Sequence, residues 1–432
     1  MSSNNIKKLD EYVTEGNNYQ RTNRSYAGLS TGMPKEWKIV RLYDYVNILK
    51  GYAFSSRYFN SEKRGLPLIR IRDLGKDETE AYYDGPYEET YLVKKNDILV
   101  SMDGEFNVFL WRGPTGLLNQ RVCKIWSKDD KILDNLFLYY VLQKPLKLIE
   151  AQISQTTVKH LLDRDIKRIK IPLPPIGEQR RIAEVLSRVD EAIRLVDESI
   201  ARTERLKKGL MQELLTKGIG HKEFKQTEIG KIPKEWKVMK LKDVAEIRRG
   251  ASPRPKGDPR YFGGIIPWIK ISDLSKYKEG IYLTNTDDTV TEEGKKKSVY
   301  VEDGFLIVSN SGTIGEPAIV KTGKGGCIHD GFIFVKPKDN KLSKYFLYYF
   351  FESKKSEFKA RAQKGTQGNL NTSIWKSIKI PIPPSSEQQK ISKVLLTIDE
   401  KLKTERKKRE KLERIKKALM DLLLTGKVRV KV

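Results

Sequence analysis

The stretch IPLPPIGEQRRIAEVLSRVDEAIRLVDESIARTERLKKGLMQELLTKG occupies residues 171–218, and a similar one, IPIPPSSEQQKISKVLLTIDEKLKTERKKREKLERIKKALMDLLLTGK, occupies residues 380–427. Each opens with a pair of prolines and then continues to its closing glycine without another proline. Proline fixes φ and disfavours helix at the residue before it, so Pro175 and Pro384 predict sharp helix starts. A Glu-Gln pair follows in each first turn, where negative charge favours the helix N-terminus. We therefore predict one long helix in each stretch.

The apolar residues of the first stretch form a regular seam. They recur in alternating steps of four and three at Ile182, Leu186, Val189, Ile193, Val196 and Ile200. This heptad spacing predicts packing against another helix. At 1.5 Å per residue each helix would be about 60 Å long, which is too long for one small domain to cover. The natural partner is the other copy, although Glu405 and Arg409 stand where the first copy has Val196 and Ile200.

The composition of the whole chain points to a polyanionic partner. Its 432 residues suggest two to four domains, and 38% hydrophobic residues are enough to form cores. The chain carries 83 Lys and Arg against 56 Asp and Glu, a net charge of +27. Such an excess predicts attraction to nucleic acid. An ion-pair-rich protein from a hot environment is the alternative, and it would explain many charges of both signs but not an excess of one.

The sequence also predicts where the protein is found. No apolar run reaches the ~18 residues that a membrane span needs, and no secretory segment opens the sequence. Cys123 and Cys327 cannot build a disulfide scaffold. We expect both to be small buried hydrophobic residues in a cytoplasmic protein that does not bind a membrane.

A second internal match shows that the whole unit is repeated. MPKEWKIVRL at residues 33–42 matches IPKEWKVMKL at residues 232–241. Between this motif and the proline pair, LPLIRIRDL (66–74) parallels IPWIKISDL (266–274), and DILVSMDG (97–104) parallels DGFLIVSNSG (303–312). Both pairs predict buried strands that run into loops. LFLYYVL (136–142) and YFLYYFF (345–351) predict a helix with an apolar face.

These matches predict an α+β fold with two globular α/β domains and a pseudo-two-fold internal repeat. Because a compact domain usually returns its termini close together, the second helix should begin beside the end of the first and run antiparallel to it as a coiled coil. The expected segments are a loosely ordered polar tail (1–32), a globular domain (33–175), a long helix (176–222), a second globular domain (223–384) and a second long helix (385–432).

Motifs for catalysis are missing from the sequence. The stretch TGKGG (322–326) has glycine where a phosphate loop needs Ser or Thr. The histidines His160, His221 and His329 are scattered, and no paired cysteine spacing suggests zinc. No Asn/Asp-Pro-Pro-aromatic motif of adenine methyltransferases is present. Asp103 and Glu105 could form a metal pair, but we favour a role in shaping a turn or accepting a hydrogen bond from a cytosine amino group.

The motifs together resemble the DNA-specificity (S) subunit of Type I restriction–modification enzymes. The resemblance rests on IPLPPIGEQRRI, IPIPPSSEQQKI, the twin PKEW motifs, SMDGEF with LLNQRVC, VSNSGTIGEPAIV with GCIHDG, and the segments TTVKHL and TQGNLN. It extends from about residue 33 to the C-terminus. It implies two target-recognition domains that each read half of a split, asymmetric sequence in double-stranded DNA. It also implies two methyltransferase (M) and two restriction (R) subunits as partners, which would hold the S-adenosylmethionine, ATP and Mg, leaving this chain without a cofactor.

Candidate DNA contacts are Arg, Lys, Asn, Gln, Ser, Thr and acidic side chains near predicted loops, because these residues read base edges or hold phosphates. In the first domain they are Arg70, Arg72, Ser101, Asp103, Glu105, Asn119, Gln120, Arg121, Thr157 and Lys159. In the second they are Arg248, Arg249, Arg254, Lys256, Lys270, Ser309, Asn310, Ser311, Thr366, Gln367 and Asn369. Each of them could instead be a solvated surface residue or a turn former.

Three functions from different classes are compatible with these patterns. The favoured one is a sequence-reading adaptor, because the repeated scaffold carries different loops, GYAFSSRYF (51–59) and GASPRPKGDPRYF (250–262). A restriction or methylation enzyme in one chain is disfavoured by the missing catalytic motifs. A basic coiled-coil scaffold that binds RNA is the third, and it leaves the two diverged domains unexplained.

Overall fold

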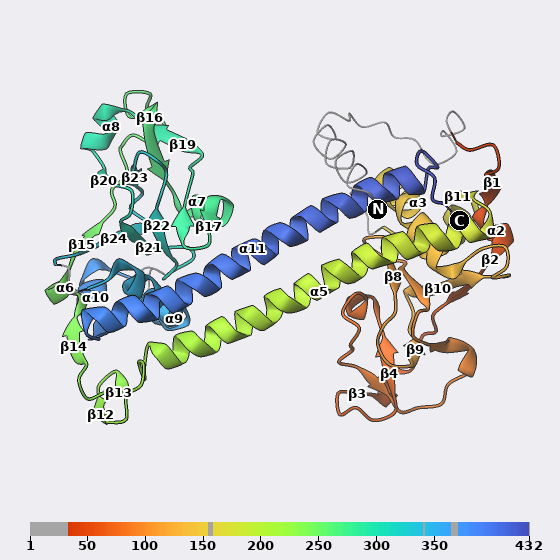
Figure 1. The fold of residues 1–432 in the computed structure, drawn as a ribbon, viewed down its shortest axis with the longest axis horizontal. Helices are drawn as coiled ribbons and strands as arrows, with labels where there is room; N and C mark the ends of the chain where they lie inside the picture. Colours follow the sequence, from red (N-terminus) through yellow and green to blue (C-terminus); the bar gives the residue numbers. More distant parts are fainter. Residues whose placement is uncertain (1–32, 154–158, 340–341, 364–369, 432) are drawn as a thin grey trace. The chain divides into compact units, whose positions relative to one another are not determined.

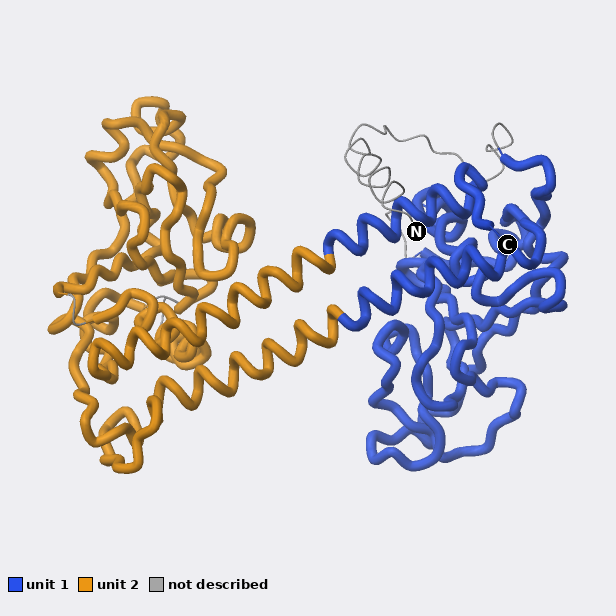
Figure 2. Tube along the Cα trace, viewed as in Figure 1, with its two compact units in different colours: residues 1–195, 410–432 blue, residues 196–409 orange. Residues whose placement is uncertain are grey.

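The computed structural model describes residues 33–153, 159–339, 342–363 and 370–431. Two compact units can be distinguished (Figure 2): unit 1 comprises residues 1–195 and 410–432, and unit 2 comprises residues 196–409. Two long helices, α5 (Ile176–Leu214) and α11 (Ser385–Leu423), each contribute residues to both units. The predicted polar tail, residues 1–32, lies outside the described residues.

The described residues of unit 1 form three sheets (Figure 1). Strand β1 (Lys38–Arg41) pairs antiparallel with β11 (Lys170–Leu173). A four-stranded antiparallel sheet has the order β2 (Val46–Lys50), β10 (Val122–Ser127), β7 (Ile98–Ser101), β8 (Val108–Leu110). A five-stranded sheet has the order β3 (Phe59–Asn60), β5 (Tyr82–Tyr83), β4 (Leu66–Ile69), β9 (Gly116–Leu118), β6 (Leu92–Val93). In this sheet β4 and β9 run parallel.

The helices of unit 1 pack on the four-stranded sheet. They are α2 (Leu42–Tyr45), α3 (Asn135–Gln152) and α4 (Asp163–Lys167), with 3₁₀ turns η3 (Ser56–Tyr58), η4 (Ile71–Asp73) and η5 (Glu89–Tyr91). Helix α3 confirms the helix predicted at residues 136–142, and it begins at an Asp134 cap that accepts from the Phe137 amide. Its Phe137 and Val141 share a core with Leu186 of α5 and Leu423 of α11.

Unit 2 repeats the same plan. Strand β14 (Lys237–Lys240) pairs with β25 (Lys379–Ile382). One sheet has the order β15 (Ala245–Arg249), β24 (Phe332–Pro337), β21 (Leu306–Ser309), β22 (Pro317–Val320), β18 (Tyr282–Leu283), β17 (Lys278–Glu279). The other has the order β19 (Asp288–Val290), β16 (Phe262–Ile269), β23 (Gly326–Ile328), β20 (Val299–Val301), with β16 and β23 parallel. A hairpin, β12 (Phe224–Thr227) with β13 (Gly230–Pro233), precedes them.

The helices of unit 2 are α6 (Leu241–Val244), α7 (Ile271–Tyr277), α8 (Glu292–Lys296), α9 (Lys344–Gln363) and α10 (Thr372–Ser377). The strand order β2-β10-β7-β8 of unit 1 recurs as β15-β24-β21-β22, and β5-β4-β9-β6 recurs as β19-β16-β23-β20. The prediction of two repeated domains of mixed α and β structure is therefore confirmed. Both cysteines are buried, and burial raises the pKa of Cys123 to about 12 and that of Cys327 to about 11.

The long helices end at Leu214 and Leu423, inside the segments 176–222 and 385–432 that the sequence assigns to them. Beyond each end a glycine, Gly218 or Gly426, adopts a positive φ that favours glycine, and the chain turns back. After α5, the Ile219 amide donates to Glu387 Oε1 at 2.9 Å, so the second helix does begin beside the end of the first.

Within each unit the two long helices are joined by ion pairs. In unit 2, Lys207 Nζ lies 2.6 Å from Asp399 Oδ1, and Arg409 Nε lies 2.6 Å from Asp197 Oδ1. The later residue on α5, Lys207, pairs with the earlier residue on α11, Asp399, so the two helices run antiparallel in unit 2. Arg409, which stands in place of an apolar seam residue on the second helix, pairs with Asp197 of the first. Of the predicted seam, Ile182, Leu186, Ile193 and Val196 are buried, and Val189 and Ile200 are half-buried.

Candidate nucleic-acid interface

In unit 1 a loop edge forms where the parallel strands β4 and β9 end. Arg70 follows β4 and Asn119 follows β9. The backbone N–H of Asn119 donates to the Ile69 carbonyl at 3.2 Å. The loop after β2 closes over this edge, because the Tyr52 amide donates to the Leu118 carbonyl at 3.0 Å. Gly51 permits this approach, since a Cβ there would lie 1.9 Å from the Asn119 carbonyl oxygen. The carboxyl ends of parallel strands are a common location of binding sites.

The polar residues of this edge differ in their freedom to bind a ligand. Arg70 turns back on its own loop, with Nε 3.0 Å from Asp73 Oδ2, and Asp73 is almost fully buried. Asn119 is 8% exposed, and its Oδ1 has no hydrogen-bond partner among the described residues. Arg121, Gln120 and Arg72 are exposed. Arg70 therefore orients the loop, whereas the side-chain oxygen of Asn119 is buried and has no partner among the described residues.

A second cluster of unit 1 surrounds Asp103. Its Oδ2 accepts from Arg121 Nη1 at 2.8 Å, and its Oδ1 lies 2.7 Å from His160 Nδ1. Ser101 is buried and donates to the Glu105 carbonyl at 2.5 Å, which shapes the turn predicted at residues 101–105. The Lys159 carbonyl accepts from the Gly104 amide at 2.9 Å. The structure thus joins predicted residues from three separate motifs, and Glu105 projects from the turn with an exposed side chain.

Unit 2 builds the same edge with different side chains. Lys270 follows β16 and His329 follows β23, and the His329 amide donates to the Ile269 carbonyl at 2.9 Å. The loop after β15 approaches as in unit 1, with the Ala251 amide donating to the Ile328 carbonyl at 3.1 Å. A Cβ on Gly250 would lie 2.2 Å from the His329 carbonyl oxygen. His329 therefore occupies the position that Asn119 has in unit 1.

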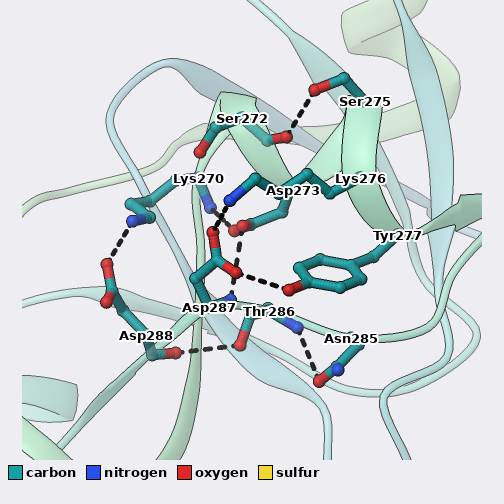
Figure 3. Close-up of polar contacts among 10 residues, drawn as sticks. All are labelled: Lys270, Ser272, Asp273, Ser275, Lys276, Tyr277, Asn285, Thr286, Asp287 and Asp288. Carbon is teal, nitrogen blue, oxygen red and sulfur yellow. Dashed lines mark hydrogen bonds and ion pairs between the residues drawn. The ribbon is translucent and has the colours of Figure 1, made fainter. Parts of the chain in front are cut away.

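Lys270 belongs to a network that fixes the neighbouring loop (Figure 3). Its Nζ pairs with Asp288, and its amide donates to Asp273 Oδ2 at 2.7 Å. Burial raises the pKa of Asp273, with backbone donors acting in the opposite direction. Asp287 accepts from Lys276 Nζ and from the Tyr277 hydroxyl, both at 2.5 Å, which holds the segment before β19 against α7. These bonds give the Lys270 side chain a defined position at the edge.

Cations and Asp330 complete the edge of unit 2. Arg249 Nε donates to the Asp330 carbonyl at 2.8 Å, and the Ser252 hydroxyl donates to Asp330 Oδ1 at 2.7 Å. Arg254 and Lys256 are exposed in the loop after β15. Arg248 is also exposed and lies 2.5 Å from Glu246.

Two predicted residues of unit 2 are interior. Ser309 is fully buried and its hydroxyl bonds to the Thr313 carbonyl, while Asn310 is 1% exposed and accepts from Trp375 Nε1 at 2.9 Å. These side chains hold the loop after β21, and Ser311, the next residue, is half-buried. Thr157, Thr366, Gln367 and Asn369 lie outside the described residues.

The sequence prediction overlooked four polar residues of these edges: His160, Ser252, His329 and Asp330. A signal for His329 was present, because aligning LLNQRVC with GCIHDG places it opposite Asn119. Ser252 carried no comparable signal, since its partner Asp330 is far away in the sequence. Within the described ranges, no group of three or more His, Cys, Asp and Glu could hold a metal ion. Nor does any helix of those ranges have the length and apolar character to cross a membrane.

A mixed α/β domain that occurs twice, each copy with a cation-rich loop edge at equivalent strand ends, is typical of a modular recognition protein. Residues 34–205 and 233–414 match the model of the Type I restriction modification DNA specificity domain. The chain belongs to this family and is a specificity subunit of the Type I restriction–modification class, with a role in DNA sequence recognition.

Individual relatives agree with this assignment. The Type I restriction enzyme MjaVIII specificity subunit of Methanocaldococcus jannaschii is 32% identical over 92% of this chain and 94% of its own length. The Type I restriction enzyme EcoBI specificity subunit of Escherichia coli is 30% identical over 82% of this chain and 77% of its own length. The crystal structure of a Type I system S subunit from M. genitalium has a TM-score of 0.61 at 18% identity, covering 92% and 97% of the two chains, which supports the fold.

Proposed function

We propose that this chain reads a bipartite, asymmetric target in double-stranded DNA, with one half-site for each repeated domain. The proposal rests on the loop edge that occurs in both units, at the ends of β4 and β9 in unit 1 and at the ends of β16 and β23 in unit 2. The same scaffold occurs in both units, which supports two DNA-reading domains of the same kind. The equivalent position is Asn119 in unit 1 and His329 in unit 2, and this difference supports half-sites of different sequence. The exposed cations Arg72, Arg121 and Arg254 would hold phosphates, and less charged groups would contact base edges.

The long helices would join the two readers as an antiparallel coiled coil with pseudo-two-fold symmetry. In support, the same contact occurs in each unit: Tyr140 and Lys416 bind Asp190 in unit 1, and Tyr349 and Lys207 bind Asp399 in unit 2. In both cases the lysine comes from the other long helix. A repeated exchange of this kind is what an internal two-fold relation requires.

We infer that the chain is not catalytic itself and recruits two M subunits, with two R subunits in the complete complex. S-adenosylmethionine, ATP and Mg would then belong to those partners. Support comes from the family to which the chain belongs and from a further solved chain, 17% identical with a TM-score of 0.53, whose structure is described as concerning complex assembly and conformational transition of the Type I system.

The test is a domain exchange read by methylome mapping. The full chain, co-expressed with its M subunit, should direct adenine methylation to a split sequence. Replacing residues 50–157 by the matching region of a related specificity subunit should change one half-site and leave the other intact. An exchange that alters both half-sites would contradict modular reading.

The isolated chain supplies the second arm of the test. With S-adenosylmethionine, ATP and Mg but without M subunits, it should neither methylate nor cleave duplex DNA. Robust turnover under these conditions would show that the chain is an enzyme.

A further inference from the structure

The residue after the second parallel strand is equivalent in the two units: Asn119 follows β9 and His329 follows β23. We propose that His329 determines specificity in the second half-site by presenting its imidazole Nε2–H as a donor to an acceptor on a base edge. This inference rests on the proposed function and names a reading atom within it. His329 is held where a reading residue is expected, at the cation-rich edge formed with Arg249, Lys270 and the loop after β15.

The backbone fixes which nitrogen of His329 carries the hydrogen. The Gly331 amide donates to His329 Nδ1 at 2.9 Å. A backbone N–H can only donate, so Nδ1 must offer its lone pair and the hydrogen of the neutral ring is on Nε2. Asp330 Oδ1 also lies 3.1 Å from Nδ1 and accepts from the Ser252 hydroxyl at 2.7 Å. Asp330 could accept a hydrogen from Nδ1, but the Gly331 amide cannot, so the amide decides the tautomer. Nε2 is left as a donor with no partner among the described residues.

The surroundings keep the ring neutral. Burial lowers the pKa of His329 below its ordinary value of 6.5; Asp330 acts against this, and the positive Arg254, Lys256 and Lys270 lower it further. In a neutral imidazole whose Nδ1 accepts from the Gly331 amide, the remaining hydrogen-bonding group is the Nε2–H donor. A protonated ring would lose the bond from the Gly331 amide, because Nδ1 would then also be a donor.

The ring is also held in place before any ligand arrives. Its centroid lies 5.9 Å from that of Trp268, whose side chain is buried. Its carbonyl accepts from the Phe332 amide at 3.0 Å, and its own amide is bound to Ile269. The side chain is nevertheless 39% exposed. A group that is fixed by its neighbours and still open to solvent suits readout, because little side-chain entropy is lost on binding.

The donor defines the class of ligand. In the major groove, guanine N7 and O6, adenine N7 and thymine O4 are acceptors, whereas the cytosine amino group is a donor. His329 would thus favour a base pair that places an acceptor opposite Nε2. Asn119, at the equivalent position of unit 1, is 8% exposed and carries an amide in place of the imidazole. Different chemistry at one position of the repeated fold would make the two half-sites differ.

Two substitutions of His329 distinguish the role of Nδ1 from that of Nε2. His329→Asn can place its amide oxygen near Nδ1 to accept from Gly331, but it is too short to replace Nε2. His329→Gln can place an amide donor near Nε2 but gives up the Gly331 bond. The full chain, assembled with its M subunit, is used to select from a pool of random-sequence duplexes. We expect H329N to lose discrimination at one base pair of the second half-site by roughly tenfold to a hundredfold, with the first half-site unchanged.

Control substitutions distinguish base recognition from phosphate binding. H329Q should keep selecting at the same base pair, with the same or an altered preferred base, which also covers the case in which H329N fails to fold. Lys256→Gln should weaken binding to all sequences alike and reduce the salt dependence by about 0.9 per phosphate contact. Unchanged selection by H329N, or an equal loss on every sequence, would overturn the inference. If the unmodified complex selects no split sequence, the proposed function itself has failed.

Discussion

Two half-buried carboxylates show how individual residues connect the repeats. Asp190 accepts from the Tyr140 hydroxyl at 2.8 Å and from Lys416 at 2.7 Å, and Asp399 is bound in the same way by Tyr349 and Lys207. Burial and the nearby carboxylate raise the pKa of Tyr140 far above its ordinary value, so its hydroxyl remains a donor. Both ion pairs are less than one-fifth exposed, and removing either partner leaves the other charge poorly solvated.

Replacing Lys416 by methionine should destabilise unit 1. The change removes the charge that balances Asp190, and we expect a loss of about 3 kcal/mol in the free energy of unfolding. Equilibrium denaturation followed by tryptophan fluorescence measures it. Adding D190N to K416M should recover part of the loss, because the uncompensated charge is then gone.

The matched control for this prediction is Arg188→Met on α5. Arg188 pairs with Glu184 at the solvent-exposed surface, where ion pairs contribute little. R188M should leave the unfolding midpoint almost unchanged. Equal effects of K416M and R188M would show that the contact to Asp190 has no special role.

The lowered pKa of His329 predicts a pH dependence of stability. In the unfolded chain this histidine takes up a proton near pH 6.5, whereas in the folded protein it does so only at lower pH. Its contribution is therefore complete above the unfolded pKa and is lost as the pH falls toward the folded pKa. Lowering the pH from 7.5 to 5 should destabilise the wild type more than H329N, as measured by thermal unfolding. A larger loss in H329N would contradict the assignment.

At the scale of residues, the sequence predicted which polar side chains lie near the loop edges better than it predicted what each of them contacts. Arg70 and Lys270 are at the predicted loop edges, but their pairing with Asp73 and Asp288 depends on local turns that no pattern reveals. Ser309 and Asn310 were predicted as contacts because they are polar and follow a strand, and the structure buries both. Polar residues that satisfy a buried loop and those that face a ligand have the same composition, so only their position distinguishes them.

At the scale of elements, the local sequence predicted where the long helices begin, whereas the contacts made by the chain beyond their ends could not be predicted. Pro175 and Pro384 immediately precede α5 and α11, because proline ends the preceding extended segment and suits a first turn. The ends depend on tertiary contacts made after the helix. Beyond α11, Arg429 returns to Glu178, with Nε 2.6 Å from Oε1 and Nη2 2.9 Å from Oε2. Nothing in a local pattern identifies a partner so far away in the chain.

The returning C-terminal segment should stabilise the start of α5. Glu178 is 1% exposed and is held by Trp37 Nε1 as well as by Arg429. Arg429→Met leaves this buried carboxylate with fewer donors, so we expect a clear fall in the thermal unfolding midpoint of unit 1. Glu178→Gln in the same background should restore part of it.

The control is Glu36→Gln, which removes only the exposed contact of Arg429. This change should have a much smaller effect on the midpoint. If R429M and E36Q behave alike, the returning segment is not anchored through Glu178.

At the scale of the whole molecule, the repeat is similar in its contacts but unequal in its charge. Helix α5 carries eight Lys and Arg against eight Asp and Glu, whereas α11 carries twelve against seven. The exposed residues Lys401, Lys407 and Lys408 contribute to this excess. Unlike the apolar seam, charge on an exposed helix face does not affect folding strongly, so the two copies could diverge.

Binding of duplex DNA by the assembled complex should weaken steeply with salt. Each neutralised phosphate contributes a log–log slope near −0.9, and the net charge of +27 supports several contacts. Fluorescence anisotropy over a range of KCl concentrations measures the slope. Replacing Lys401, Lys407 and Lys408 by glutamine should make it shallower without changing either half-site. A flat response, or tighter binding to an RNA duplex of equal length, would favour the RNA-binding alternative.

The exchange of lysines between the repeats has an evolutionary consequence. Lys207 belongs to the first repeat and neutralises an aspartate of the second, while Lys416 does the reverse. A gene that lost one repeat would leave Asp190 or Asp399 without its cation unless a second copy of the product supplied it. Loss of one repeat from the fused chain would therefore be destabilising. Recombination between the motifs at Trp37 and Glu178, in contrast, can replace a recognition edge and leave the Asp190–Lys416 pair in place, provided that the incoming segment again supplies the tyrosine that donates to Asp190.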